Sequence, residues 1–64
     1  MIVKAKDLVK QLVRAGYVEV RQKGSHKRFM CAGKEPLTVP WHSNGNQDLH
    51  PKIVKDCLKK AGLL

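Results

Sequence analysis

The chain has 64 residues, and its 13 Lys and Arg residues outnumber its five Asp and Glu residues, giving a formal net charge of +8 at pH 7. A chain this short is expected to form a single domain over residues 1–64, without room for a lid or an enclosed cofactor cleft, because it buries only about 60% of the surface that it exposes when unfolded. The positive charge favours a polyanionic partner, nucleic acid first and a strongly acidic protein second, although a basic surface can also serve solubility alone.

The first predicted element is an amphipathic helix over about residues 4–15. Its apolar positions recur at the three- and four-residue spacing of one helix face, namely Ala5, Leu8, Val9, Leu12 and Val13. Gly16 follows this stripe directly and suits the left-handed position that commonly ends a helix.

Two strands joined by a tight turn are expected next. Residues 17–22 alternate between apolar and charged side chains, as in a half-buried strand with its valines inward. Residues 23–25 form the turn and residues 26–31 the second strand. Because side chains alternate along a strand, an inward-pointing Phe29 would place His26 on the open face of the sheet.

The second half of the chain predicts a third strand, a loop and a second helix. Residues 37–39 are bounded by prolines, which are best tolerated at strand ends, and residues 41–48 are polar and turn-rich. The closing helix begins near Pro51 and stops at Gly62. The fold class is therefore α+β in the order α-β-β-β-α, with two helices on one face of a three-stranded antiparallel sheet and the other face open.

The strongest chemical signal is a histidine that follows a Gly–Ser turn and has cations on both sides. The residues concerned are Lys23, Gly24, Ser25, His26, Lys27 and Arg28. RNA carries its own nucleophile, the 2′-hydroxyl, so an enzyme needs only to deprotonate it and to stabilise charge on the phosphorane. His26 suits the general base, the cations suit phosphate binding, and Gly24 would let the sugar-phosphate backbone approach closely. The alternative is an ordinary surface histidine, with Ser25 closing the turn.

The remaining histidines and the large aromatic residues carry weaker signals. His42, at the end of the third strand, could approach the same face, but a loop histidine is the simpler interpretation. His50 is expected to be structural or incidental near the start of the second helix. Tyr17 and Trp41 could stack on bases, although packing is the preferred interpretation. The three His and two Cys residues lack metal-ligand spacing, so neither a metal site nor a cofactor is predicted.

The apolar pattern also bears on location. The first residues lack the apolar segment of a signal peptide, and no run approaches the roughly 18 apolar residues of a membrane span. We therefore expect no membrane association and a cytoplasmic location.

Several short motifs occur in a recognisable order over nearly the whole chain. They are Leu8 and Leu12, Gly16-Tyr17, Gly24-Ser25-His26 with Phe29, Thr38-Val39-Pro40 with His42, and Leu58-Lys59-Lys60-Ala61-Gly62. In this order the sequence resembles HicA, the toxin of HicA–HicB type II toxin–antitoxin systems. It departs from the family pattern where Pro51-Lys52 replaces a frequent Pro-Gly pair, so a difference in detail is expected at the start of the last helix.

The resemblance implies a double-stranded-RNA-binding-domain-like fold and an endoribonuclease. The activity would be that of a metal-independent, ribosome-independent mRNA interferase that arrests translation and growth, with His26 as the catalytic residue. The partners would be an mRNA or single-stranded RNA substrate and a HicB-like antitoxin that covers the active site. The residues expected to contact RNA are Lys23, Gly24, Ser25, Lys27, Arg28 and His42.

Two alternatives without catalysis remain. One is an RNA-binding module of the same fold, which would use the basic face for phosphate and 2′-hydroxyl contacts. The other is a ribosome-associated structural protein. The Gly-Ser-His motif on an open strand argues against both, and substitution of His26 distinguishes them, because a binding protein tolerates that change and an enzyme does not.

Overall fold

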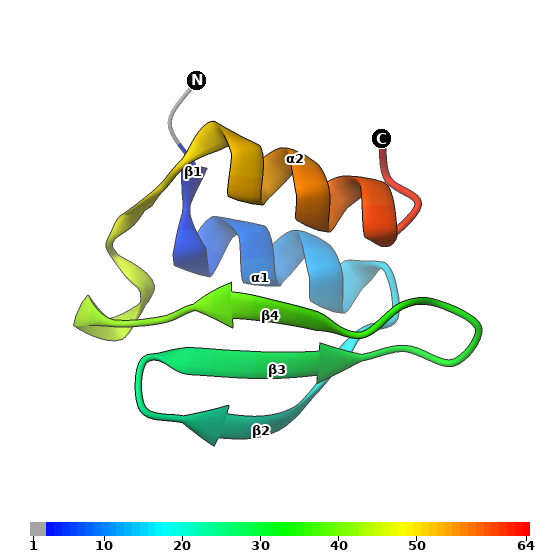
Figure 1. Ribbon diagram of the computed structural model, residues 1–64, viewed down its shortest axis with the longest axis horizontal. Helices are drawn as coiled ribbons and strands as arrows, with labels where there is room; N and C mark the ends of the chain where they lie inside the picture. Colours follow the sequence, from blue (N-terminus) through cyan, green and yellow to red (C-terminus); the bar gives the residue numbers. More distant parts are fainter. Residues whose placement is uncertain (1–2) are drawn as a thin grey trace.

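The computed structural model describes residues 3–64 and combines two helices with a three-stranded and a two-stranded antiparallel sheet (Figure 1). The elements in chain order are β1 (Val3–Lys4), α1 (Ala5–Arg14), β2 (Val18–Lys23), β3 (His26–Met30), β4 (Leu37–Pro40), the 3₁₀ turn η1 (Ser43–Gly45), β5 (Asp48–Leu49) and α2 (Pro51–Lys60). Strands β2, β3 and β4 lie between the helices in sequence, so the predicted α+β class and the α-β-β-β-α order of the main elements are confirmed.

Helix α1 forms where its apolar stripe was predicted. Ala5, Leu8 and Leu12 are buried, whereas Val13 lies at one edge of the stripe and remains 54% exposed. The helix ends in a Schellman motif, in which the Gly16 N–H donates to the Val13 carbonyl and the Tyr17 N–H donates to the Leu12 carbonyl, each at 3.0 Å. These bonds satisfy carbonyls that have no partner within the helix and turn the chain towards β2.

Helix α2 begins at Pro51, as predicted, and runs beside α1 in Figure 1. The Nδ1 atom of His50 accepts a hydrogen bond of 3.1 Å from the Lys52 N–H, which satisfies one of the free donors at the start of the helix. Of the two alternatives expected for His50, structural or incidental, the structure shows the structural one. No helix within residues 3–64 is long and apolar enough to cross a membrane.

The three-stranded sheet has the order β2-β3-β4, and Figure 1 shows β4 next to the helices and β2 at the far edge. On the helix side of the sheet, Phe29, Leu37 and Val39 are buried. The expectation that β2 buries its valines was wrong, since Val18 is 61% exposed and Val20 is 52% exposed. Its position at the edge farthest from the helices leaves β2 without a layer to cover it.

The pairing of β2 with β3 contains a β-bulge. Glu19 pairs with Phe29, but the next pair joins Arg21 to Arg28, so Val20 is an extra residue without a partner. Beyond the bulge, the side chains of β2 face the opposite side of the sheet from the one that regular alternation continued from Glu19 would give them. Arg21 therefore shares a face with Arg28, the face that the helices leave uncovered.

The chain between β4 and α2 is more ordered than the predicted surface loop. Residues 43–45 form η1, and β5 pairs antiparallel with β1, Val3 opposite Leu49 and Lys4 opposite Asp48. The Ala5 N–H also donates to the Gln47 carbonyl at 3.1 Å. Strands of two residues carry no alternation that a sequence could reveal, so this small sheet was not anticipated.

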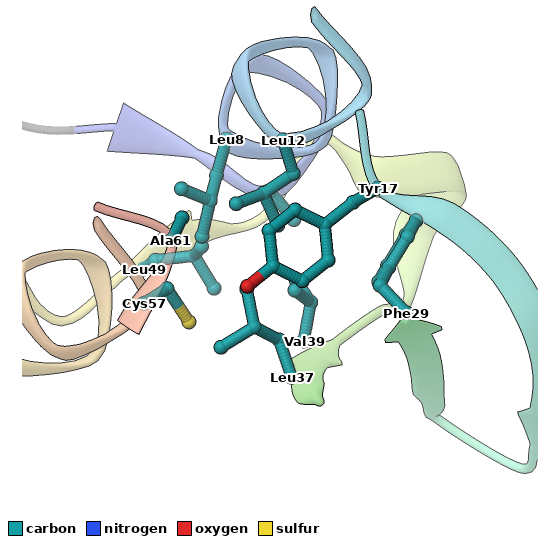
Figure 2. Packing of buried hydrophobic residues seen from close by; sticks show 10 residues of the cluster. Leu8, Leu12, Tyr17, Phe29, Leu37, Val39, Leu49, Cys57 and Ala61 are labelled. Atoms are coloured by element: carbon teal, nitrogen blue, oxygen red, sulfur yellow. The ribbon is translucent and has the colours of Figure 1, made fainter. Parts of the chain in front are cut away.

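The core gathers residues from both helices, β3 and β4 around the ring of Tyr17 (Figure 2). Its buried members are Ala5, Leu8, Leu12, Tyr17, Phe29, Leu37, Val39, Leu49, Cys57 and Ala61. The Tyr17 hydroxyl donates to the Glu35 carbonyl at 2.9 Å and lies 3.4 Å from the Lys60 carbonyl, so it links the loop before β4 to the end of α2. The packing role preferred for Tyr17 is confirmed.

Candidate functional site

The site is built at the hairpin that joins β2 to β3. Gly24 and Ser25 form a two-residue loop, and the φ of +57° at Gly24 is the backbone conformation that such a loop requires at its first position. This loop fixes the register, so Lys23 stands directly opposite His26, and Pro40 of β4 lies on the other side of His26. Since Phe29 is buried on the helix side, the exposed His26 lies on the open face, as predicted.

The open face is hollowed next to His26. A shallow depression of about 220 Å³ is lined by Arg21, Lys23, His26, Arg28 and Thr38. The salt bridges within residues 3–64 all use other cations, in the pairs Lys4–Asp48, Lys27–Glu19 and Lys60–Asp56. Three positive charges therefore surround the imidazole without a carboxylate partner, an arrangement that favours an anion such as a phosphate.

The structure separates the predicted site residues into two groups. Lys23 and Arg28 line the depression with His26, and Gly24 and Ser25 form the exposed turn beside it. Lys27 lies on the opposite face of β3, where its Nζ is 3.1 Å from Glu19 Oε1 and 4.1 Å from the centroid of the Trp41 ring.

His42 is likewise outside the depression. It is exposed and precedes η1, and it is not among the residues that line the hollow. The structure thus brings neither Lys27 nor His42 to the position of His26, and the expectation that they contact RNA stays a prediction.

Two residues of the depression were missed by the sequence analysis. Thr38 lies opposite Arg28, and its place on the open face follows from the burial of its neighbours Leu37 and Val39. The alternation of β4 was therefore a usable signal for Thr38. The predicted strand with its valines inward also put Arg21 on the open face, but on a wrong premise, because Val18 and Val20 are exposed and Glu19 pairs with the buried Phe29.

Trp41 holds the Gly–Ser turn in place. Its backbone N–H donates to the Ser25 carbonyl at 2.6 Å, which ties the end of β4 to the hairpin loop. Its ring packs so closely on the buried Gly45 that a Cβ atom there would overlap it. The ring also lies against the Lys27 ammonium group, which is near enough for a cation–π interaction. The packing role preferred for Trp41 is confirmed. In addition, its backbone N–H holds the loop that precedes His26.

These observations define a class of protein: a small basic α+β domain whose uncovered sheet face presents a histidine within a cation-lined depression. A family model described as the HicA toxin of bacterial toxin–antitoxin systems matches residues 5–63, and the chain therefore belongs to the HicA toxin family.

Solved structures agree with this assignment. The chain is similar to one from a structure described as a toxin–antitoxin complex from Streptococcus pneumoniae, with a TM-score of 0.77 and 30% sequence identity. The similarity covers 94% of this chain and 97% of that one. A comparison with curated proteins finds no match. The family resemblance and the fold that it implied are thereby confirmed.

Proposed function

We propose that this HicA toxin is an mRNA interferase, a metal-independent endoribonuclease that uses His26 as its general base. The observation that carries the proposal is the position of His26, exposed on the open sheet face and surrounded by Arg21, Lys23 and Arg28. A solvent-accessible imidazole can accept a proton near neutral pH, and the three cations attract the phosphate whose neighbouring hydroxyl supplies that proton.

The reaction follows from this geometry and from the chemistry of RNA. His26 removes the proton of a 2′-hydroxyl, and the oxygen attacks the adjacent phosphorus while the 5′-oxygen of the next nucleotide leaves and takes up a proton. The negative charge that builds up on the phosphorane is stabilised by the cations of the depression. The products carry a 2′,3′-cyclic phosphate and a 5′-hydroxyl, and their identity is a direct test of this route.

An antitoxin is the second expected partner. The similar Streptococcus pneumoniae chain comes from a toxin–antitoxin complex, which supports a HicB-like inhibitor that covers the depression of this chain. The net charge of +8 favours an inhibitor with an acidic contact surface, because opposite charges accelerate association. Both partners would be met in the cytoplasm, where mRNA is translated.

The test of the proposed function is an RNase assay on the wild-type protein and two variants, His26→Ala and His26→Gln. Each is incubated with a long single-stranded RNA in excess EDTA, and circular dichroism is recorded on all three. We expect cleavage by the wild type alone and matching spectra, because an exposed His26 contributes little to the fold. Lys55→Ala, which changes an exposed residue of α2 far along the chain from the hairpin, is the control and should cleave like the wild type.

Two results would contradict the proposal. Loss of cleavage on addition of EDTA would indicate a metal-dependent reaction. RNA binding without cleavage by any of the proteins would favour the alternative, a non-catalytic RNA-binding module of the same fold.

A further inference from the structure

The depression contains two rows of side chains that run across the sheet. The first row consists of Lys23 and His26, which stand opposite each other. The second row consists of Arg21, Arg28 and Thr38, one from each strand, paired through the register of β2 with β3 and of β3 with β4. Only the first row contains the proposed general base.

The second row is unfavourable for the isolated protein. Like charges directly opposite each other on neighbouring strands destabilise a sheet, and Arg21 faces Arg28 in this way. No carboxylate within residues 3–64 lies within salt-bridge distance of either guanidinium group. An anion placed between the two arginines would remove this repulsion.

The spacing of the two rows identifies the anion. His26 and Arg28 are two residues apart on one strand, which separates the rows by about 6.6 Å at a rise of roughly 3.3 Å per residue. This is comparable with the separation of consecutive phosphates along a single nucleic-acid strand. A guanidinium group matches a phosphate with a two-pronged hydrogen bond, and the Thr38 hydroxyl adds a further donor.

We propose that Arg21, Arg28 and Thr38 form a second phosphate subsite, which holds the phosphate next to the one that is cleaved beside His26. The inference rests on the proposed function, because His26 defines which phosphate is cleaved. It adds that the substrate is recognised through two consecutive phosphates, and that Arg21, which pairs with Arg28 beyond the bulge at Val20, is a binding residue.

The first arm of the test measures binding and does not depend on cleavage. An eight-nucleotide single-stranded RNA is titrated against His26→Ala, and against the same protein with Arg21→Gln or Arg14→Gln added, at several salt concentrations. Arg14 is the matched control, since it is an exposed arginine at the end of α1. We expect Arg21→Gln to weaken binding about tenfold or more, as the loss of a charge-assisted contact does. It should also reduce the slope of log K against log salt by about 0.7, the value for one phosphate of a single strand.

The second arm measures cleavage with two short substrates. One is a dinucleotide with a single phosphodiester, and the other carries one additional terminal phosphate. Arg21→Gln should lower kcat/KM about tenfold more for the longer substrate than for the dinucleotide, whereas Arg14→Gln should affect neither. Arg21→Lys should fall between the wild type and Arg21→Gln, because it keeps the charge and loses the planar fork.

Thermal unfolding separates a binding role from a structural one. Removal of one of two opposed charges should leave the melting temperature of Arg21→Gln unchanged or higher. A clear decrease in the melting temperature of Arg21→Gln would contradict the proposed subsite. Equal effects of Arg21→Gln and Arg14→Gln on RNA binding would contradict it as well, and so would the absence of any RNA binding. If the wild type binds RNA but does not cleave it, the proposed function is wrong. The RNA titrations then still show whether Arg21 contributes to a phosphate-binding subsite.

Discussion

At the scale of single residues, the site depends on a contact that lies outside it. The Trp41 ring packs on Gly45, and the Trp41 backbone N–H holds the carbonyl of Ser25, the residue before His26. A side chain at position 45 would therefore displace the ring, and the displacement would pass to the hairpin loop. We therefore expect Gly45 to influence the position of His26, although Gly45 does not line the depression.

The first prediction is that Gly45→Ala destabilises the protein more than Gly33→Ala does. Both glycines have positive φ, +82° and +79°, so the backbone strain of an alanine, of the order of 1 kcal/mol, is common to the two variants. A Cβ at Gly33 meets nothing within 4 Å, whereas one at Gly45 overlaps the Trp41 ring. Urea unfolding monitored by circular dichroism measures the difference in the free energy of unfolding. Equal losses of stability in the two variants would show that the Trp41 ring moves aside without a cost.

At the scale of elements, the sequence was sufficient for the helices and insufficient for the edge strand. The apolar stripe of α1 and the start of α2 at Pro51 are local signals in the sequence, and the structure confirms both. The face of His26 also followed from local alternation, because Phe29 is the large apolar side chain of that strand.

The bulge in β2 could not be predicted from the sequence, since it depends on two constraints at the ends of the strand. The hairpin loop fixes the pairing of Lys23 with His26, and the buried Tyr17 fixes the chain just before the strand. One residue more than a regular ladder needs lies between these points, and it is accommodated as the bulge at Val20. The extra residue can be recognised only when the positions of both ends of β2 are known.

This explanation predicts that deletion of Val20 preserves the hairpin. Every pair between β2 and β3 can persist, Glu19 with Phe29 and Arg21 with Arg28 included, because only the residue without a partner is removed. We expect the variant to fold and to bind RNA within about threefold of the wild type. Nuclear Overhauser contacts across the Lys23–His26 and Arg21–Arg28 pairs are the measurement. A rearranged register would show that the bulge itself orients Arg21.

At the scale of the whole molecule, three groups couple folding to pH in the same direction. Burial raises the pKa of the Tyr17 phenol above its ordinary value of 10.0 and that of the Cys57 thiol above 9.0. The hydrogen bond to Asp56 raises the pKa of Lys60 above 10.5. In each case the folded chain retains a proton that the unfolded chain has begun to lose, so unfolding releases protons at alkaline pH.

We therefore predict that the free energy of unfolding falls as the pH rises from about 8.5 to 11, because the unfolded chain binds fewer protons than the folded chain over this range. Urea unfolding at a series of pH values measures this. In Cys57→Ala the decline should be shallower near pH 9, where the thiol of the unfolded chain ionises, and unchanged near pH 10.5. A free energy of unfolding that increases over this range would contradict the burial of both groups.

Trp41 is the single tryptophan of the chain, and its position makes it a built-in optical probe of the site. Its indole lies against the Lys27 ammonium group, and its amide holds the loop that carries His26. Any ligand or inhibitor that moves this loop changes the surroundings of the indole and therefore its fluorescence. The proposed binding of RNA in the depression, and the proposed displacement of RNA by an antitoxin, would thus be followed in the natural sequence without a label.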